Sequence, residues 1–265
     1  MKIAKVLLGV IFGVAVIAAS SDSGMAADDK PLVINVATTP TPSQRVTHNK
    51  DRPGWLIELF QEVEARTGVK FEYVFVPWDQ ALRLVRTGVA QAVFNSSYKP
   101  ERAVYGAFPM RDGKPDPSRA TVQYAYALYA HRDSGITWDG ERIGGLDGPL
   151  AVEKSASILS QLGKLGVQTL ELPNYEAMLS MVSGRRVQAL AGVDQIVDTM
   201  LTTKADHFAD IVKVEPPLQR RVGFLMFSKS FCASKSDVCE AVWNSIGEVR
   251  QTDAFKAMRA SYENP

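Results

Sequence analysis

The sequence predicts an α/β protein in which two runs of alternating strands and helices form two lobes. Short apolar segments typical of buried strands alternate with segments whose apolar residues recur at helical spacing. The alternation stops at a polar loop over residues 111–118 and restarts at residue 150, and a longer segment rich in Tyr and Val, residues 121–130, joins the two runs. Strands separated by helices of this length pair in parallel, so each lobe is expected to hold a mostly parallel sheet flanked by helices.

The first run contains three strands and two helices. In order, the elements are strand 32–37, helix 55–66, strand 71–76, helix 79–86 and strand 90–94. A Pro-rich loop over residues 38–42 ends the first strand, and Gly68 and Gly88 follow the two helices in the positions that favour glycine.

The second run repeats the pattern and leads to a helical C-terminus. In order, the elements are strand 150–153, helix 157–165, strand 168–172, helix 175–183, strand 187–191, helix 194–203 and a last strand at 222–227. The mature part of the chain contains neither an internal repeat nor a low-complexity tract.

The first 26 residues have the features of a cleavable signal peptide. Lys2 and Lys5 precede an apolar run over residues 6–19, and small residues flank Met25 at the expected cleavage site. The run is shorter than the roughly 20 residues that span a bilayer, although an uncleaved anchor is the alternative interpretation. We therefore expect a soluble protein exported to the periplasm, and the absence of cysteine near the cleavage site argues against a lipoprotein.

Charge and histidine content exclude several kinds of partner. The formal net charge is +1, which disfavours nucleic-acid binding because that depends on an excess of cationic side chains. The three histidines are scattered and show no metal-ligand spacing to the cysteines, so neither a metal nor a cofactor is predicted. Cys232 and Cys239 lie close together in the chain, and export to an oxidising compartment makes a local disulfide the expected state.

Residues 76–102 carry a recognisable pattern. Trp78 lies near a strand end, a helix closes at Gly88, and a polar segment ends in Pro100-Glu101-Arg102 before the pair Phe108-Pro109. Gly54-Trp55 and the segment 184–187 add weaker correspondences. In these positions the chain resembles the family 3 extracellular solute-binding proteins, the amino-acid-binding type of periplasmic binding protein, and the resemblance extends over nearly all of residues 31–262.

The resemblance implies the type 2 periplasmic binding fold. Residues 31–127 together with 222–265 would form lobe 1, residues 129–217 would form lobe 2, and the ligand would lie in the cleft between them. A cleft between the lobes is also the expected place for a ligand on general grounds, because open α/β sheets bind ligands at the carboxyl ends of their strands.

The resemblance also implies a set of ligand contacts. Arg102 would hold the ligand's carboxylate through two parallel hydrogen bonds, the alternative being a surface arginine in a first helical turn. The other implied or candidate contacts are polar groups at strand ends and tryptophans that could form an apolar wall: Asn95, Ser96, Ser97, Trp78, Trp55, Thr38, Thr39, Ser155 and Ser157. Turn formation, helix capping and burial in the core are the alternative roles of these residues.

The second lobe departs from the family at two positions. Lys154 stands where the family has a glycine before its Ser or Thr. The aspartate that binds a ligand's α-amino group in many members corresponds here to Asp194, which falls one residue late, so that it either binds an amine or caps the next helix.

Three function classes follow. The first is a binding protein that delivers a carboxylate-bearing ligand, an amino acid or a related molecule, to an inner-membrane ABC permease. The second is a periplasmic subunit that reports the ligand to a membrane receptor. The third, an enzyme on the same fold, is disfavoured because we find no nucleophile elbow, phosphate loop, zinc pair or triad. We expect a monomer.

Overall fold

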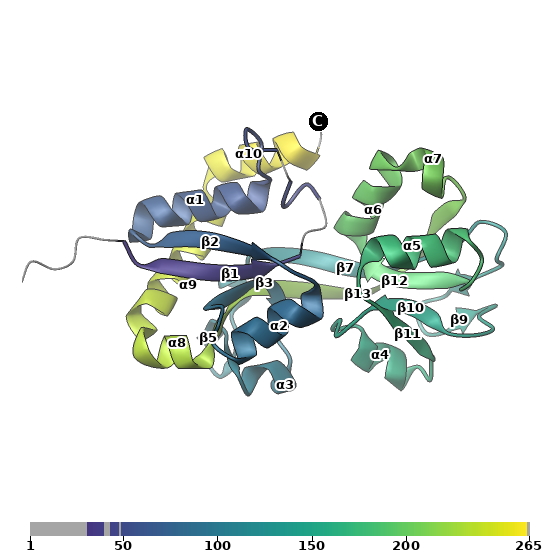
Figure 1. The fold of residues 1–265 in the computed structure, drawn as a ribbon, viewed down its shortest axis with the longest axis horizontal. Helices are drawn as coiled ribbons and strands as arrows, with labels where there is room; N and C mark the ends of the chain where they lie inside the picture. The colour runs from purple at the N-terminus through teal and green to yellow at the C-terminus, as the bar shows by residue number, and fades with distance from the viewer. Residues whose placement is uncertain (1–30, 40–42, 48, 264–265) are drawn as a thin grey trace, which may run out of the picture. The chain divides into compact units, whose positions relative to one another are not determined.

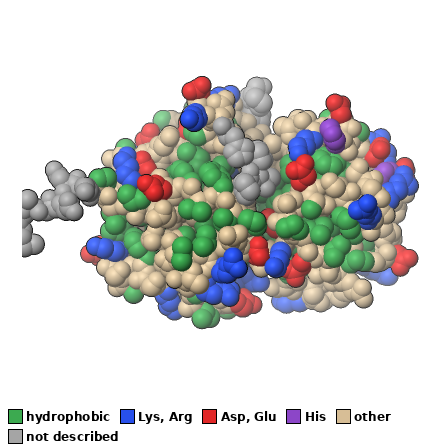
Figure 2. All heavy atoms as spheres, viewed as in Figure 1, with side chains coloured by type: hydrophobic (Ala, Val, Ile, Leu, Met, Phe, Trp, Pro, Cys, Tyr) green, Lys and Arg blue, Asp and Glu red, His purple; other side chains and the backbone are tan. Residues whose placement is uncertain are grey.

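The computed structural model of the chain describes residues 31–39, 43–47 and 49–263. The expected signal peptide, residues 1–26, lies outside the described residues. Within them, no helix combines the length and the apolar character needed to cross a membrane. On the face drawn in Figure 2, cationic and anionic side chains are interspersed, in keeping with the small net charge.

A nine-stranded sheet runs through the described part of the chain (Figure 1). Its strands follow the order β11-β10-β12-β7-β13-β3-β1-β2, with β4 (Gly106–Ala107) pairing with β13. One parallel group consists of β1 (Val33–Thr38), β2 (Lys70–Phe75) and β3 (Ala92–Ser97). The other consists of β10 (Leu150–Glu153), β11 (Thr169–Leu172) and β12 (Ala189–Val193). These two groups confirm the predicted mostly parallel pairing.

Two antiparallel strands connect the groups. β7 (Val122–His131) pairs with β12 on one side and with β13 (Ile211–Ser228) on the other, and β13 continues to pair with β3. The sequence predicted one long connecting strand and placed the last strand at 222–227, whereas the structure has two. Pro216 and Pro217 lie where the pairing of β13 with β7 shifts register between Val214 and Gln219. Proline in a strand marks a bulge or an edge, so the sequence pattern concealed the first half of β13.

The helices lie against both faces of this sheet (Figure 1). In the first half of the chain they are α1 (Trp55–Thr67), α2 (Trp78–Arg86), α3 (Pro100–Ala103) and the 3₁₀ turn η1 (Pro117–Arg119). The second half contains α4 (Leu159–Lys164), α5 (Tyr175–Ser183), α6 (Asp194–Thr203), α7 (Ala205–Phe208), α8 (Lys229–Ser234), α9 (Ser236–Gln251) and α10 (Asp253–Glu263). The loop predicted at 111–118 instead begins with a short hairpin of β5 (Met110–Arg111) and β6 (Lys114–Pro115), and another pairs β8 (Thr137–Trp138) with β9 (Ile143–Gly144).

Alternation along β1 explains the two layers of helices around the first strand group. Ile34 and Val36 belong to the core cluster that contains the buried residues of α1 and α9, whereas Ala37 belongs to the cluster under α2. Successive side chains of a strand point to opposite faces, so a strand that is apolar at consecutive positions needs cover on both sides. This packing holds the carboxyl ends of the strands in fixed positions.

Cys232 in α8 and Cys239 in α9 form a disulfide, with a Cα–Cα distance of 5.9 Å. The bridge predicted from their spacing is thus confirmed. It joins the helix that follows β13 to the long helix that packs against α1.

Candidate functional site

A pocket opens where the carboxyl ends of four strands meet. Thr38 ends β1, Asn95 lies near the end of β3, Glu153 ends β10 and Val193 ends β12, and all four line the pocket. The empty space among the lining residues, including the part open to solvent, is about 650 Å³. The carboxyl ends of strands are the position at which sheets of this topology bind a ligand.

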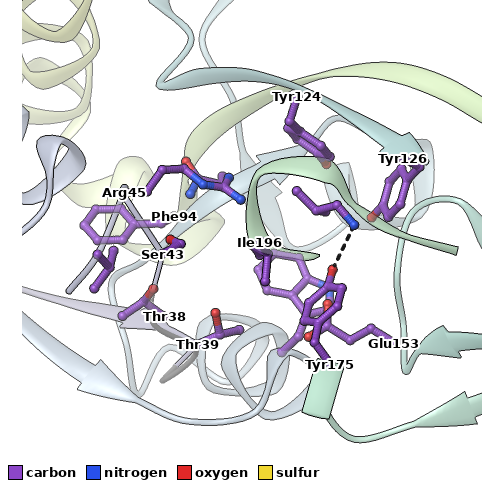
Figure 3. Close-up of a pocket in the computed structure, with 14 residues that line it drawn as sticks. Thr38, Thr39, Ser43, Arg45, Phe94, Tyr124, Tyr126, Glu153, Tyr175 and Ile196 are labelled. Carbon is purple, nitrogen blue, oxygen red and sulfur yellow. Dashed lines mark hydrogen bonds between the residues drawn. The ribbon is translucent and has the colours of Figure 1, made fainter. Parts of the chain in front are cut away.

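The lining combines aromatic walls with few charges (Figure 3). The aromatic members are Trp78, Phe94, Tyr124, Tyr126 and Tyr175, the uncharged polar members are Thr38, Thr39, Ser43 and Asn95, and the remaining apolar members are Val46, Val193 and Ile196. Among the described residues of the lining, two belong to the charged residue types: Arg45 from the segment after β1 and Glu153 from β10.

Arg45 is a buried cation that lines the pocket. Its side chain is 4% exposed, and its Nη2 atom has no hydrogen-bond partner among the described residues. Burial lowers the pKa of the guanidinium from its ordinary value, and the nearby Tyr175 and Tyr124 oppose that effect. Burying a guanidinium N–H donor without a hydrogen-bond partner costs free energy. An anionic group in the pocket would accept a hydrogen bond from that donor.

The backbone of Arg45 is held against the start of α1. The Leu56 N–H donates to the Arg45 carbonyl at 3.1 Å. Gly54 has a φ of +108°, and a Cβ atom there would lie 2.4 Å from the Arg45 carbonyl oxygen. Glycine is therefore required at position 54 both for its backbone conformation and for the close approach of the Arg45 segment.

Glu153 is a buried acid on the same pocket. Its side chain is 8% exposed, and burial raises its pKa to about 8, with a smaller contribution in the same direction from Asp79. Tyr175, Arg45 and Arg102 act in the opposite direction. The carboxyl group is therefore largely neutral at pH 7.

Three tyrosines form a neutral polar wall. Tyr124 and Tyr126 are two residues apart on β7, which places them on the same face with ring centroids 5.7 Å apart. The Val193 N–H donates to the Tyr175 hydroxyl at 3.4 Å, the contact drawn as a dashed line in Figure 3. Burial raises the pKa values of Tyr126 and Tyr175 well above the ordinary value, so both hydroxyls stay protonated and can hydrogen-bond a ligand.

Arg102 lies beside the pocket and has partners of its own. Its Nη1 donates to the Ser97 carbonyl at 3.0 Å, and its Nη2 donates to the Ser155 carbonyl at 3.0 Å. Its guanidinium carbon is 5.3 Å from the centre of the Trp78 ring, and Trp78 Nε1 also donates to the Ser155 carbonyl, at 3.3 Å. The Ser155 carbonyl thus accepts from two side chains that precede β7 in the chain.

An ion pair adds to this contact between the two strand groups. Lys154 Nζ lies 3.1 Å from Asp79 Oδ2. Lys154 and Ser155 follow β10, whereas Asp79 lies in α2, which packs on β1. Lys154, which stands where the family has a glycine, therefore contacts the other strand group, next to the Ser155 carbonyl.

Residues 32–262 match the bacterial extracellular solute-binding proteins, family 3. The chain belongs to this family. Among curated proteins, the search found no match.

Solved structures show the same fold at low sequence identity. The amino acid ABC transporter substrate-binding protein AbpA from Streptococcus pneumoniae, bound to L-arginine, has a TM-score of 0.69 at 14% identity, covering 87% of this chain and 94% of that one. A histidine kinase sensor domain with similarity to periplasmic binding proteins has a TM-score of 0.72 at 15% identity, covering 89% and 98%. The GluR0 ligand-binding core from Nostoc punctiforme, in complex with L-glutamate, has a TM-score of 0.68 at 10% identity, covering 89% and 100%. The chain therefore has the two-lobed α/β fold of these binding proteins.

The structure brings only part of the predicted contact set to the pocket. Thr38, Thr39, Trp78 and Asn95 line it. Asn95 has a φ of 55°, a left-handed conformation that asparagine tolerates better than most residues, and its side-chain oxygen accepts from the Thr121 hydroxyl at 2.9 Å.

The serines among the predicted contacts do not line the pocket. Ser96 is fully buried in β3, and the Ser97 hydroxyl accepts from Arg102 and from the Tyr124 hydroxyl. Ser157 donates to the Tyr126 hydroxyl at 3.3 Å. The helix predicted to start at Ser157 begins at Leu159, so neither Ser155 nor Ser157 lies in its first turn.

Trp55 and Asp194 also lie away from the lining. Trp55 is 1% exposed in the core, packed edge-on against Phe255. Asp194 is the first residue of α6, and its Oδ1 accepts from the backbone N–H groups of Ala125 and Gln195. Trp55 thus lies in the core, and Asp194 comes directly after Val193, the N-cap residue of α6.

The sequence reasoning missed the two ionisable groups, Arg45 and Glu153, and the tyrosine wall. Tyr124 and Tyr126 had a signal, because alternate positions of a predicted strand share one face. Glu153 also had one, as an acid at the end of an otherwise apolar strand. Arg45 had none, since it lies in an irregular segment whose return to the pocket depends on tertiary contacts.

Proposed function

We propose that this chain is a periplasmic solute-binding protein that captures a small carboxylate-bearing ligand, an amino acid or a related molecule, and delivers it to an inner-membrane ABC importer. The lobes are 31–127 with 222–265, and 129–217. They close on the ligand without changing it chemically. Support comes from the family and from the arginine-bound and glutamate-bound proteins that share the fold.

The buried guanidinium of Arg45 is the observation that supports a carboxylate on the ligand. Its Nη2, which has no partner among the described residues, and its place in the lining favour an anion, and the planar guanidinium matches a carboxylate. The family resemblance assigns the same role to Arg102. Since both Nη atoms of Arg102 already donate to carbonyl groups, we assign the direct ligand contact to Arg45.

The test is thermal unfolding of ligand-free protein with each of the twenty L-amino acids and with a set of simple carboxylates. A ligand that binds only the folded state adds about 2.7 kcal/mol at 100 times its dissociation constant. For a chain of this length each 1 kcal/mol raises the melting temperature by roughly 2–4 °C, so the expected rise is about 5–11 °C. No change with any compound would count against the proposed function.

A sensing role is the second candidate, because one similar structure is a histidine kinase sensor domain. Both roles need the same closing pocket, so binding assays do not separate them. Uptake of the radiolabelled ligand by cells with and without the gene does. Loss of uptake supports delivery to an importer, whereas unchanged uptake with a lost transcriptional response supports sensing.

A further inference from the structure

Glu153 is a buried acid that faces the pocket without a cation paired to it. It ends β10 and is 8% exposed, and no described Lys, Arg or His forms an ion pair with it. The adjacent Lys154 turns away to pair with Asp79. In Figure 3, Glu153 and Tyr175 lie on one side of the pocket and Arg45 on the other. The pocket therefore offers an acid and a cation from opposite sides.

The charged and titratable groups around Glu153 come from five elements. They are Tyr175 in α5, Asp79 in α2, Arg45 in the segment after β1, Arg102 in α3 and Tyr126 in β7. Burial dominates and raises the pKa of Glu153 to about 8, and the two arginines do not offset it. In the empty pocket at pH 7 the group is thus largely a neutral acid.

We propose that Glu153 is a proton-coupled anchor for a cationic group of the ligand, such as an ammonium. When that group binds, the O–H bond of the carboxylic acid breaks, the proton passes to solvent, and the resulting carboxylate pairs with the ligand cation. The inference rests on the proposed function and deepens it. The ligand would carry an anionic group for Arg45 and a cationic group for Glu153, with a body that packs against the aromatic walls.

Coupling of ligand binding to proton release from Glu153 sets the direction in which affinity changes with pH. A carboxylate buried beside a cation is stabilised, whereas the same carboxylate alone is disfavoured by desolvation. Affinity for a ligand with a cationic group should therefore rise with pH, by up to tenfold per pH unit below about 8, and level off above that value. A ligand analogue that lacks the cationic group should not show this rise.

The first test is direct titration of Glu153 in the empty protein. Carbon NMR of protein labelled with [δ-¹³C]glutamate follows each carboxyl group, and the signal absent from Glu153→Gln identifies Glu153. Glu101→Gln, which changes an exposed acid in α3, is the matched control. We expect a midpoint near 8 that falls when methylammonium chloride replaces sodium chloride at equal ionic strength. A midpoint near the ordinary value of glutamate overturns the inference.

The second test counts protons during binding. Each amino acid that stabilises the protein is titrated by calorimetry at pH 7 in two buffers of different ionisation enthalpy, with its deaminated analogue as the ligand control. Wild type and Glu101→Gln should release close to one proton per amino acid bound, and Glu153→Gln should release close to none. Glutamine has the shape of the neutral acid, so the fold is expected to survive, and the wild-type count does not depend on the variant.

The outcomes separate this inference from the proposed function. Binding without proton release leaves the solute-binding function standing and overturns the role of Glu153. A Glu153 midpoint that neither methylammonium nor any bound amino acid moves does the same. Failure of every amino acid and carboxylate to bind contradicts the proposed function, while the methylammonium titration still decides whether Glu153 responds to a cation.

Discussion

At the scale of single residues, two buried arginines near the pocket differ in what their donors contact. Arg45 lines the pocket, and its Nη2 atom has no hydrogen-bond partner in the part of the chain that the structure describes. Arg102 donates to the carbonyls of Ser97 and Ser155. We therefore expect Arg45 to bind the ligand's carboxylate and Arg102 to stabilise the contact between the two strand groups.

Substitution of each arginine by glutamine should show this difference. Arg45→Gln should weaken binding of an amino acid about 10- to 100-fold, because a charge-assisted hydrogen bond contributes about 1.5–3 kcal/mol. It should also abolish the preference for the acid over its α-amide. Arg102→Gln should weaken binding of the acid and of the amide by the same factor. Calorimetric titration of both ligands measures these effects.

Arg83→Gln is the control, since Arg83 is an exposed arginine of α2. It should bind the acid and the amide as wild type does. Loss of the acid preference in Arg102→Gln, with the preference intact in Arg45→Gln, would instead support the ligand contact that the family resemblance implies for Arg102.

The two arginines differ in whether a local sequence pattern marks them. Arg102 was found because it lies in a motif, Pro100-Glu101-Arg102, whose residues are adjacent in the chain. Arg45 reaches the pocket through the contact of its backbone with Leu56 and Gly54, and no local pattern encodes such an approach. The sequence therefore predicted part of the pocket, such as Trp78 and Asn95, but not its buried cation.

At the scale of elements, the bridge between α8 and α9 is a local constraint on the C-terminal helices. Its two cysteines are seven positions apart. In the chain-entropy model a loop of this size contributes roughly 2–3 kcal/mol to the free energy of unfolding. Reduced wild type and Cys232→Ser/Cys239→Ser should both lose about that amount in urea denaturation.

Comparing the reduced protein with the double variant controls for the substitution itself, because Cys239 is buried and serine there costs energy of its own. Alkylation without reductant, followed by intact-mass measurement, checks the starting state. Two modified thiols in the untreated protein would show that the bridge does not form.

The strands show which elements local pattern can predict. β10 and α5 match the predicted bounds, since each is a single apolar run or stripe ended by polar residues. β13 was found only in its second half, because Pro216 and Pro217 interrupt the pattern. Its pairing with β7 depends on tertiary contacts, and a local hydrophobic pattern does not predict which strand is the partner.

At the scale of the whole molecule, the fold places the ends of four strands around one space. The two parallel groups contribute Thr38, Asn95, Glu153 and Val193 to it, and β7 adds two tyrosines. The sequence predicted both groups from the repeated alternation of strands and helices. Which side chains face the pocket depends on how the two strand groups pack together. The alternation of strands and helices along the sequence does not encode that packing.

The proposed function requires that this pocket hold a small carboxylate-bearing molecule through Arg45. Native mass spectrometry of the protein as purified from cells tests it most directly, with Arg45→Gln and Arg83→Gln prepared in parallel. Wild type and Arg83→Gln should carry a small molecule that is released on denaturation and contains a carboxylate, and Arg45→Gln should carry little or none. A wild-type protein without a bound molecule, or a molecule retained equally by Arg45→Gln, would show that Arg45 does not hold a carboxylate ligand in this pocket.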